Sequence, residues 1–520
     1  MRIRIRIRQI ANLPAMRAIL SFFDSLWFPA AYAVLALVSS FTGMEIAFYA
    51  ITAAIVVFTS VFSRDSKPLL VPVFMGVYAV SRVHAPQPPV ESDFFYNRGV
   101  QIYLLCLGAA FISCLIFRFI VFPQDRNFFK ESKLRLGIIL MAAAFLLNGV
   151  FFGGYKIADL PFGLLTALSF FALYIYFYNT LYIGEGTGRY VGRLLVMTAG
   201  IIFLQLCKIY IFDGVVSGGS VNKDNIITGW GTDSDIGGML AIFLPACFYI
   251  AYTCRRFGFI FYVLGFVFFA GTLLTFSLTS VLVGGAVLIA AAIYLSVKRS
   301  PVRRFARIFN IAVIVACAVM AAVFRDLLYD FFAVFLERGL GDTDRLGLWS
   351  NGIRNFLRAP LFGAGFFGSP ENLQNAANRL LPEMYCNIFI QMLASCGIFG
   401  LIAYIVHILQ AAFAVRRDPA SESMFYIAVL VSIFAMSLSE NFIFRVFPAM
   451  VYSVFLLLSE REGEDGPLLL VRPLLIKLIR RKKREEGAEG AASAAGGGAC
   501  NSAASCNAPP KCPAGEQHDL

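Results

Sequence analysis

The sequence predicts an all-α polytopic membrane protein with about 14 transmembrane helices (12–14) and one long outward-facing loop between helices 11 and 12. Hydrophobic residues make up 59% of the 520 residues and charged residues only 15%, with a mean hydropathy of +0.73. The apolar residues form runs of about 20, the length that crosses the hydrocarbon core of a bilayer as a helix. Backbone groups in lipid must be satisfied within their own segment, which favours helices, and the alternating polarity of a barrel strand is absent.

The predicted spans follow one another along most of the chain. They are centred near residues 34, 54, 75, 109, 145, 173, 200, 244, 266, 288, 315, 399, 430 and 450. The first apolar segment lacks a small-residue cleavage site and is followed by further spans. It is therefore predicted to be an anchor and not a removed signal peptide.

Lysine and arginine set the predicted topology. The amino-terminal MRIRIRIRQ, the connections FPQDRNFFKESKLR and VKRSPVRRFAR, and the late segment IRRKKREE are basic, whereas HAPQPPVESDFFYN is not. With 14 spans the basic segments fall on the cytoplasmic side, together with both termini, of a bacterial cytoplasmic (inner) membrane protein. The net charge of +12 thus indicates topology and contact with membrane lipids, and no nucleic acid is expected as a partner.

Composition divides the chain into four parts. We expect a basic amino-terminal interfacial segment at 1–25, a transmembrane domain at 26–458, a basic cytoplasmic interfacial helix at 459–484 and a disordered low-complexity tail at 485–520. The eleven cysteines show no paired spacing typical of metal ligands. No metal and no cofactor is therefore expected.

The longest connection, at 325–385, is predicted to face outward. It contains six arginines and no lysine: Arg325, Arg338, Arg345, Arg354, Arg358 and Arg379. A guanidinium is a planar fork that matches phosphate oxygens, which favours recognition of a diphosphate. The alternative is that these arginines pair with nearby acids. A shorter outward connection, at 213–235, contains Trp230, Asp233 and Asp235.

Within the long loop, GDTDRLGLWSNGIRNFLRAP predicts one helix along the membrane surface, capped by Asp342 or Thr343 and ended by Pro360. Its spacing places apolar Leu346, Trp349, Ile353 and Phe356 on one face, with Arg354 and Arg358 on another. The following LFGAGFFG contains Gly363 and Gly365. A structural turn is the favoured interpretation, and a phosphate cradle is the alternative.

The stretch MYCNIFIQ begins the twelfth predicted span with polar side chains. Tyr385, Cys386 and Asn387 lie at the outer membrane boundary, and Gln391 follows one turn deeper on the same face as Asn387. One interpretation is a site beside the loop arginines. The other is an interfacial tyrosine, a small buried cysteine and a helix-capping asparagine.

Four stretches occur in an order that resembles a known family. TGWGTDSDIGGMLAIFLPA, GDTDRLGLWSNGIRNFLRAPLFGAGFFG, MYCNIFIQMLASCGIFGLIAY and SENFIFRVFPA resemble the O-antigen ligase and O-antigen polymerase family over residues 190–458. The resemblance implies a metal-independent glycosyltransferase with a polyprenyl-diphosphate-linked oligosaccharide as donor. A chain-length regulator or a flippase would be its partners. In matching positions, Arg345 is the arginine before the loop tryptophan, Gly363 and Gly365 are the turn glycines, and Asn387 is the asparagine that usually follows a histidine.

The sequence departs from the family pattern at three positions. Cys386 replaces the histidine that is proposed to activate the acceptor, Leu278 replaces an arginine after Ser277, and Asp235 stands where many relatives have asparagine. A neutral imidazole accepts a proton near pH 7, whereas a thiol does so only once ionised. Asp233, Asp235 and Glu440 are alternative bases, a Cys386 thiolate beside arginines is another, and loss of catalysis is a third alternative.

The predicted function is transfer of a glycan from polyprenyl diphosphate, with polymerisation of O-antigen, capsular or exopolysaccharide repeat units preferred over ligation. We expect Arg345, with Arg354 or Arg358, to hold the diphosphate. Asn387 and Gln391 would orient acceptor hydroxyls, and Trp349 or Trp230 would stack on a sugar ring. The alternatives are an O-antigen-type ligase, a polysaccharide transporter or flippase, and a non-catalytic relative.

Overall fold

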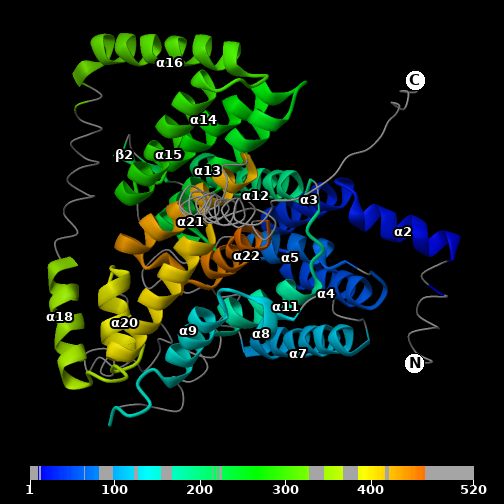
Figure 1. Ribbon diagram of the computed structural model, residues 1–520. Helices are drawn as coiled ribbons and strands as arrows, with labels where there is room; N and C mark the ends of the chain where they lie inside the picture. Colours follow the sequence, from blue (N-terminus) through cyan, green and yellow to red (C-terminus); the bar gives the residue numbers. More distant parts are fainter. Residues whose placement is uncertain are drawn as a thin grey trace, which may run out of the picture. The chain divides into compact units, whose positions relative to one another are not determined.

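The computed structural model describes residues 10, 13–63, 65–80, 98–121, 127–153, 167–184, 186–212, 215–217, 220–221, 225–326, 329, 345–366, 385–415 and 421–462. Over these residues the fold is mostly helical, as predicted (Figure 1). The basic repeat at 1–9, the predicted caps Asp342 and Thr343, Arg338, Arg379 and the chain beyond Glu462 lie outside the described residues.

The elements before the first strand are α2 (Pro14–Asp24), α3 (Trp27–Thr42), α4 (Glu45–Phe62), η1 (Lys67–Leu69), α5 (Leu70–Met75), η2 (Gly76–Ala79), α7 (Arg98–Val121), α8 (Phe128–Glu131), α9 (Arg135–Leu147), the π-helix η4 (Leu168–Ala172), α11 (Leu173–Thr180) and α12 (Thr187–Phe212). After the strands follow α13 (Asp233–Thr253), α14 (Gly258–Leu274), α15 (Leu278–Val297), α16 (Arg303–Val323), α18 (Arg345–Arg358), α20 (Ile388–Val415), α21 (Ser421–Glu440), η6 (Phe442–Phe444) and α22 (Val446–Glu462).

Within the described part of the chain, eight helices are long and apolar enough to cross a membrane: α4, α7, α12, α13, α15, α16, α20 and α21. A ninth would be the pair α2 and α3, which is bent by 70°. This is a multi-pass membrane protein, but the predicted count of about 14 spans is not confirmed. All the predicted centres fall inside helices, because shorter helices such as α9 and α11 cover the remaining ones.

Helix α13 lies at the centre of the packing. Of its membrane-length stretch, 89% is buried, and it packs against α12, α14, α15 and α21. A helix that is apolar all round is stable only when neighbours surround it, and α13 has them. Glycines permit the closest approaches: a Cβ on Gly238 would lie 2.1 Å from Cζ of Phe442.

The helix ends that the topology predicts on the outer side lie together. The start of α13 meets the end of α14 and the start of α15, where Gly237 contacts Thr275 and Ser280. The end of α21 joins them, since Ser439 Oγ donates to Thr279 Oγ1 at 3.0 Å. These helices therefore alternate in direction along the chain.

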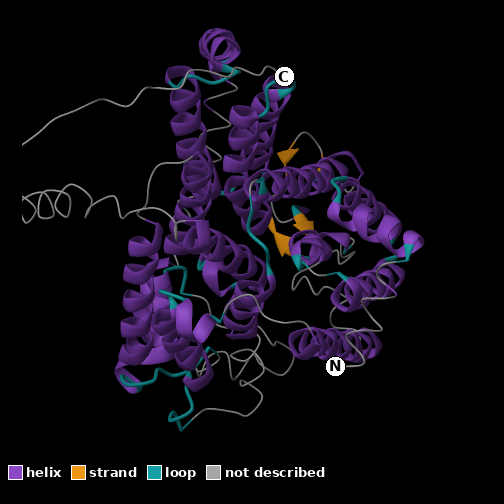
Figure 2. Ribbon diagram, turned by 45° about the vertical axis from the view of Figure 1, so that its right-hand side comes forward, coloured by secondary structure: helices purple, strands orange, loops and turns teal. Residues whose placement is uncertain are grey.

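The connection between α12 and α13 contains two small antiparallel hairpins that the sequence analysis did not predict (Figure 2). Strand β1 (Val216–Ser217) pairs with β2 (Ser220–Val221), and β3 (Ile227–Thr228) pairs with β4 (Gly231–Thr232). In the second hairpin, Thr228 Oγ1 donates to Gly231 O at 2.9 Å. The hairpin leads directly into the first turn of α13.

Helix α18 lies beside α20 (Figure 1). The side that packs against α20 contains the buried residues Gly352 and Asn355, and a Cβ on Gly352 would lie 2.5 Å from Ile390. Two residues of the predicted apolar stripe face away, since Leu346 is 73% exposed and Ile353 49% exposed, whereas Trp349 and Phe356 are partly buried. An exposed apolar stripe is what a helix lying in a membrane surface presents to lipid.

A backbone break divides α20, and the loop after α18 fills it. Gly397 has φ +68° inside α20, so the helix is interrupted there. Ala364 N donates to Ala394 O at 2.8 Å, and Ile398 N donates to Pro360 O at 2.8 Å. Gly363, with φ +71°, would place a Cβ 2.3 Å from the carbonyl carbon of Ser395. The loop and the broken helix are thus interlocked through their backbones.

Candidate functional site

The short linker at 440–445, between α21 and α22, is where the polar contacts meet. Its residue Asn441 has φ +52°, a left-handed conformation that asparagine tolerates better than most residues. The linker contacts α18, α13 and α20 through three separate side-chain interactions.

The first contact is an ion pair with α18. Arg345 Nη2 lies 3.3 Å from Glu440 Oε1, and their side chains are 33% and 12% exposed. This brings the first residue of α18 to the end of α21, across 95 residues of sequence. Arg345 is therefore positioned by an acid that is itself largely screened from solvent.

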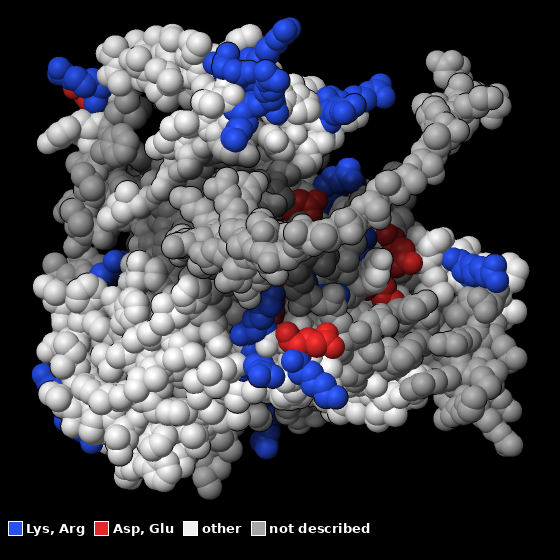
Figure 3. Space-filling view, viewed as in Figure 1, with Lys and Arg blue, Asp and Glu red and all other residues white. Residues whose placement is uncertain are grey.

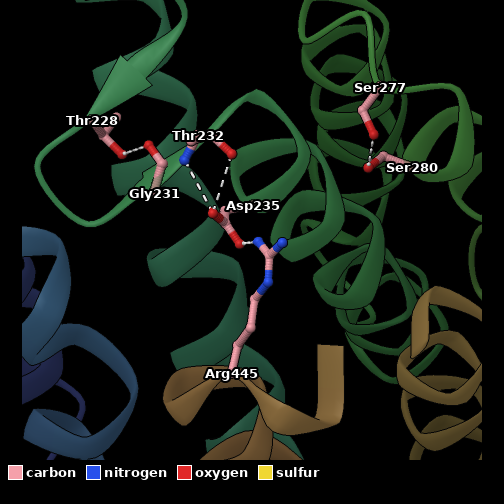
Figure 4. Close-up of polar contacts among 7 residues, drawn as sticks. All are labelled: Thr228, Gly231, Thr232, Asp235, Ser277, Ser280 and Arg445. Carbon is pink, nitrogen blue, oxygen red and sulfur yellow. Dashed lines mark hydrogen bonds and ion pairs between the residues drawn. The ribbon is translucent and has the colours of Figure 1, made fainter. Parts of the chain in front are cut away.

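The second contact is an ion pair with α13, between Arg445 and Asp235 (Figure 4). Asp235 Oδ2 also accepts from Thr232 N at 3.0 Å and from Thr232 Oγ1 at 3.3 Å, which caps the start of α13. Burial lowers the pKa of Arg445 to about 10, while the charge of Asp233 acts to raise it. The guanidinium is still protonated at neutral pH.

The third contact reaches the polar stretch at the start of α20. Gln391 Oε1 accepts from Asn441 Nδ2 at 2.8 Å and from Tyr385 N at 3.0 Å, while Gln391 Nε2 donates to Ser395 Oγ at 2.9 Å. Gln391 is fully buried. Its amide therefore organises the protein and does not point to an open cavity.

Two residues next to it have structural contacts as well. Asn387 Oδ1 accepts from Phe389 N at 3.0 Å and from Ile390 N at 3.3 Å, which caps the start of α20. Tyr385 is buried and its hydroxyl accepts from Asn355 Nδ2 at 2.8 Å. Cys386 lies between them, half-buried, with φ +50°.

Hydroxyl groups line the neighbouring helix ends. Ser277 Oγ and Ser280 Oγ are 2.8 Å apart at the start of α15, to one side of Asp235 and Arg445 (Figure 4). Leu278, at the position where the family has arginine, is partly buried and packs against the apolar core. Arg445, paired with Asp235, places a cation at this end of the bundle.

The predicted tryptophans differ in their surroundings. Trp230 Nε1 donates to Gln205 Oε1 at 3.0 Å, and its ring meets Tyr78 edge-on at 4.7 Å, so it fastens the hairpin to α12 and η2. Trp349 is one turn beyond Arg345 on α18. Its indole Nε1 is buried and has no hydrogen-bond partner among the described residues.

The loop arginines are not all gathered at one point. Arg354 and Arg358 are exposed on α18, about 14 Å and about 20 Å along the helix axis from Arg345. Arg345 therefore lies more than two helical turns from both. Arg325 pairs with its neighbour Asp326 at 3.4 Å and is exposed.

The glycine turn has a structural explanation. The amides of Ala364 and Gly365 donate to the carbonyls of Ala394 and Ser395, at 2.8 and 3.1 Å. These donors are used inside the protein, which favours the turn over a phosphate cradle. Both Gly363 and Gly365 have positive φ, so the chain needs glycine there.

Arg445 is the functional candidate that the sequence analysis missed. It stood in the stretch SENFIFRVFPA, and an arginine five residues after an acid, beside a predicted outer membrane boundary, was a usable signal. Its link to Asp235 spans more than two hundred residues, and no spacing in the sequence indicates that pairing.

Comparison with known proteins adds an independent finding. Residues 263–405, from within α14 to within α20, match the family described as O-antigen ligase. No curated protein matches the chain. Arg345, Asn387 and Gln391 lie inside the matched stretch, whereas Asp235, Glu440 and Arg445 lie outside it. Over residues 263–405, this chain is therefore similar to the O-antigen ligase family, which supports the resemblance seen in its motifs.

Proposed function

We propose that this protein transfers a sugar chain from a polyprenyl diphosphate to an acceptor hydroxyl at the outer face of the cytoplasmic membrane, and that it polymerises repeat units of a surface polysaccharide. One observation carries the proposal: Arg345 pairs with Glu440 at one end of the linker, and Arg445 at its other end pairs with Asp235, so each of the two guanidinium groups is held by an acid. A diphosphate bears charges that such planar donors match.

In this mechanism the donor competes with the resident acids. The diphosphate of the donor binds Arg345 in place of Glu440. The guanidinium then stabilises the negative charge that develops on the polyprenyl diphosphate as it leaves. Arg445 stays paired with Asp235, and its guanidinium adds positive potential beside the diphosphate. Trp349 offers a buried indole N–H next to Arg345 for a sugar hydroxyl or a phosphate oxygen.

Displacement of Arg345 would break its ion pair with the Glu440 carboxylate, which we propose as the base. The acceptor hydroxyl gives its proton to the Glu440 carboxylate, its oxygen bonds the anomeric carbon, and the bond from that carbon to the phosphate oxygen breaks with inversion. Asp235 is less suited to this role, because its oxygens already bind Thr232 and Arg445. The Cys386 thiol is the alternative base, and it needs prior ionisation.

The test is complementation of a deletion strain, with surface glycan and lipid-linked glycan sized on the same gel. For a polymerase, Arg345→Ala and Glu440→Gln should leave single lipid-linked repeats without long polymer, at normal protein level. Arg325→Ala removes an exposed arginine of the same loop and should behave as wild type. Polymer of normal length in Arg345→Ala would refute the assignment.

The same gel separates the other candidates. A ligase, which the description of the matched family favours, would accumulate long chains on the lipid carrier when it is lost. Unchanged glycan in both fractions of the deletion strain would indicate a non-catalytic relative. Cys386→Ala distinguishes the bases: activity is kept if Glu440 accepts the proton and lost if the thiol does.

A further inference from the structure

An apolar groove of about 410 Å³ lies between α13, α15 and α21. Its walls include Tyr249 and Tyr252 of α13, Ala286 and Tyr294 of α15, and Val431 of α21. Apart from Ser432 and the tyrosine hydroxyls, every lining side chain is apolar. The groove occupies the half of these helices that is remote from the linker at 440–445. Its volume is in the usual range for a ligand of lipid or drug size.

Positive charge gathers where this groove ends. Seven cations stand in the two turns that follow α13 and α15 and in the first turns of α16: Arg255, Arg256, Lys298, Arg299, Arg303, Arg304 and Arg307. The turns touch, since a Cβ on Gly258 would lie 2.6 Å from Cγ1 of Val302. Figure 3 shows Lys and Arg side chains gathered at this end, near α14 and α16.

Two of the seven have a defined contact with α15. Arg303 Nε and Arg307 Nε both donate to Ser296 O, at 3.4 and 2.8 Å. None of the seven pairs with an acid among the residues that the structure describes. Beside the groove, Glu422 accepts from the hydroxyl of the lining residue Tyr249 at 2.9 Å. The cluster therefore keeps its positive charge.

The groove and the cations are continuous. The rings of Tyr252 and Tyr294 lie 6.0 Å apart at the end of the groove, and Lys298 N donates to Tyr294 O at 2.9 Å, one turn further on. Arg255 follows Tyr252 by three residues. An apolar slot thus opens onto an uncompensated cationic rim within about one helical turn.

We propose that this is a binding site for an anionic glycerophospholipid. An acyl chain lies in the groove, and the phosphate contacts Lys298, Arg299 and Arg255. The lipid matches the site in charge as well as in shape. Guanidinium and ammonium groups at a membrane surface attract anionic headgroups, and they attract a zwitterionic headgroup less strongly. The site is independent of the proposed glycan transfer, since it shares no residue with the linker contacts.

Native mass spectrometry of the full-length protein in a neutral detergent tests the proposal. Tetraoleoyl cardiolipin is the anionic probe and dioleoyl phosphatidylcholine the neutral one. Cardiolipin should bind at lower concentration than phosphatidylcholine. Removal of each cation should weaken cardiolipin binding about fivefold. The double variant Lys298→Gln, Arg299→Gln should therefore bind cardiolipin about 25-fold more weakly than wild type. Arg325→Gln, which removes an exposed charge elsewhere, should bind as wild type.

A second pair of variants tests the groove. Ala286→Phe fills it and should lower cardiolipin binding, whereas Ala318→Phe, on the exposed face of α16, should not. Unchanged cardiolipin binding in both the charge variant and Ala286→Phe would overturn the proposal. So would a dimer mass in lipid-free wild type that Ala286→Phe removes, because a second copy of the chain would then fill the groove.

Discussion

Gly363→Ala tests the interlock between the glycine turn and the broken helix α20. The added Cβ would lie 2.3 Å from the carbonyl carbon of Ser395 and 2.5 Å from Cys396 N. Both are backbone atoms, so no side-chain rotation relieves the contact. A left-handed φ at a non-glycine residue costs about 1–2 kcal/mol. Overpacking in a close-packed interior costs a further 1–3 kcal/mol or so.

We therefore expect Gly363→Ala to lower the free energy of unfolding by about 2–5 kcal/mol. Unfolding of the purified protein by SDS titration in a mild detergent measures it. The matched control is Gly108→Ala in α7, where an added Cβ meets nothing within 4 Å. The control should be neutral or slightly stabilising, because alanine favours helix over glycine by about 1 kcal/mol. Equal unfolding curves for the two variants would refute the interlock.

Three further predictions concern side-chain contacts and use the same unfolding assay. In a double-mutant cycle, Asp235→Asn and Arg445→Gln should show a coupling of about 1–3 kcal/mol, and simple additivity would contradict the ion pair. Gln391→Leu should destabilise by about 1–3 kcal/mol, because Asn441 Nδ2 loses a buried acceptor, and wild-type stability would exclude that role. Glu460→Gln should destabilise by a similar amount of about 1–3 kcal/mol, because this buried carboxylate accepts from three donors around Ser132, and an unchanged curve would show that these bonds contribute little.

Parts of the candidate site could be predicted from the sequence because they depend on local chemistry. A helix cap was one of the two interpretations of Asn387 before an apolar run, and Asn387 caps α20. A structural turn was the favoured interpretation of the glycines of LFGAGFFG, and Gly363 and Gly365 form one with positive φ. The prediction that Arg345 and Arg354 hold one diphosphate depended on the distance between their side chains. In α18 the two arginines are nine residues apart.

The sequence by itself determined the class of the protein, since long apolar runs and few charges leave only membrane helices as a stable structure. Its motifs, whose order needs no coordinates, also indicated the family that residues 263–405 match. Only the tertiary structure decided which acid holds which arginine. Arg345 with Glu440 and Arg445 with Asp235 are pairs between helices far apart in the chain. Such pairs depend on how the apolar surfaces of the helices pack together. Packing brings together residues that are separated by no characteristic spacing in the sequence.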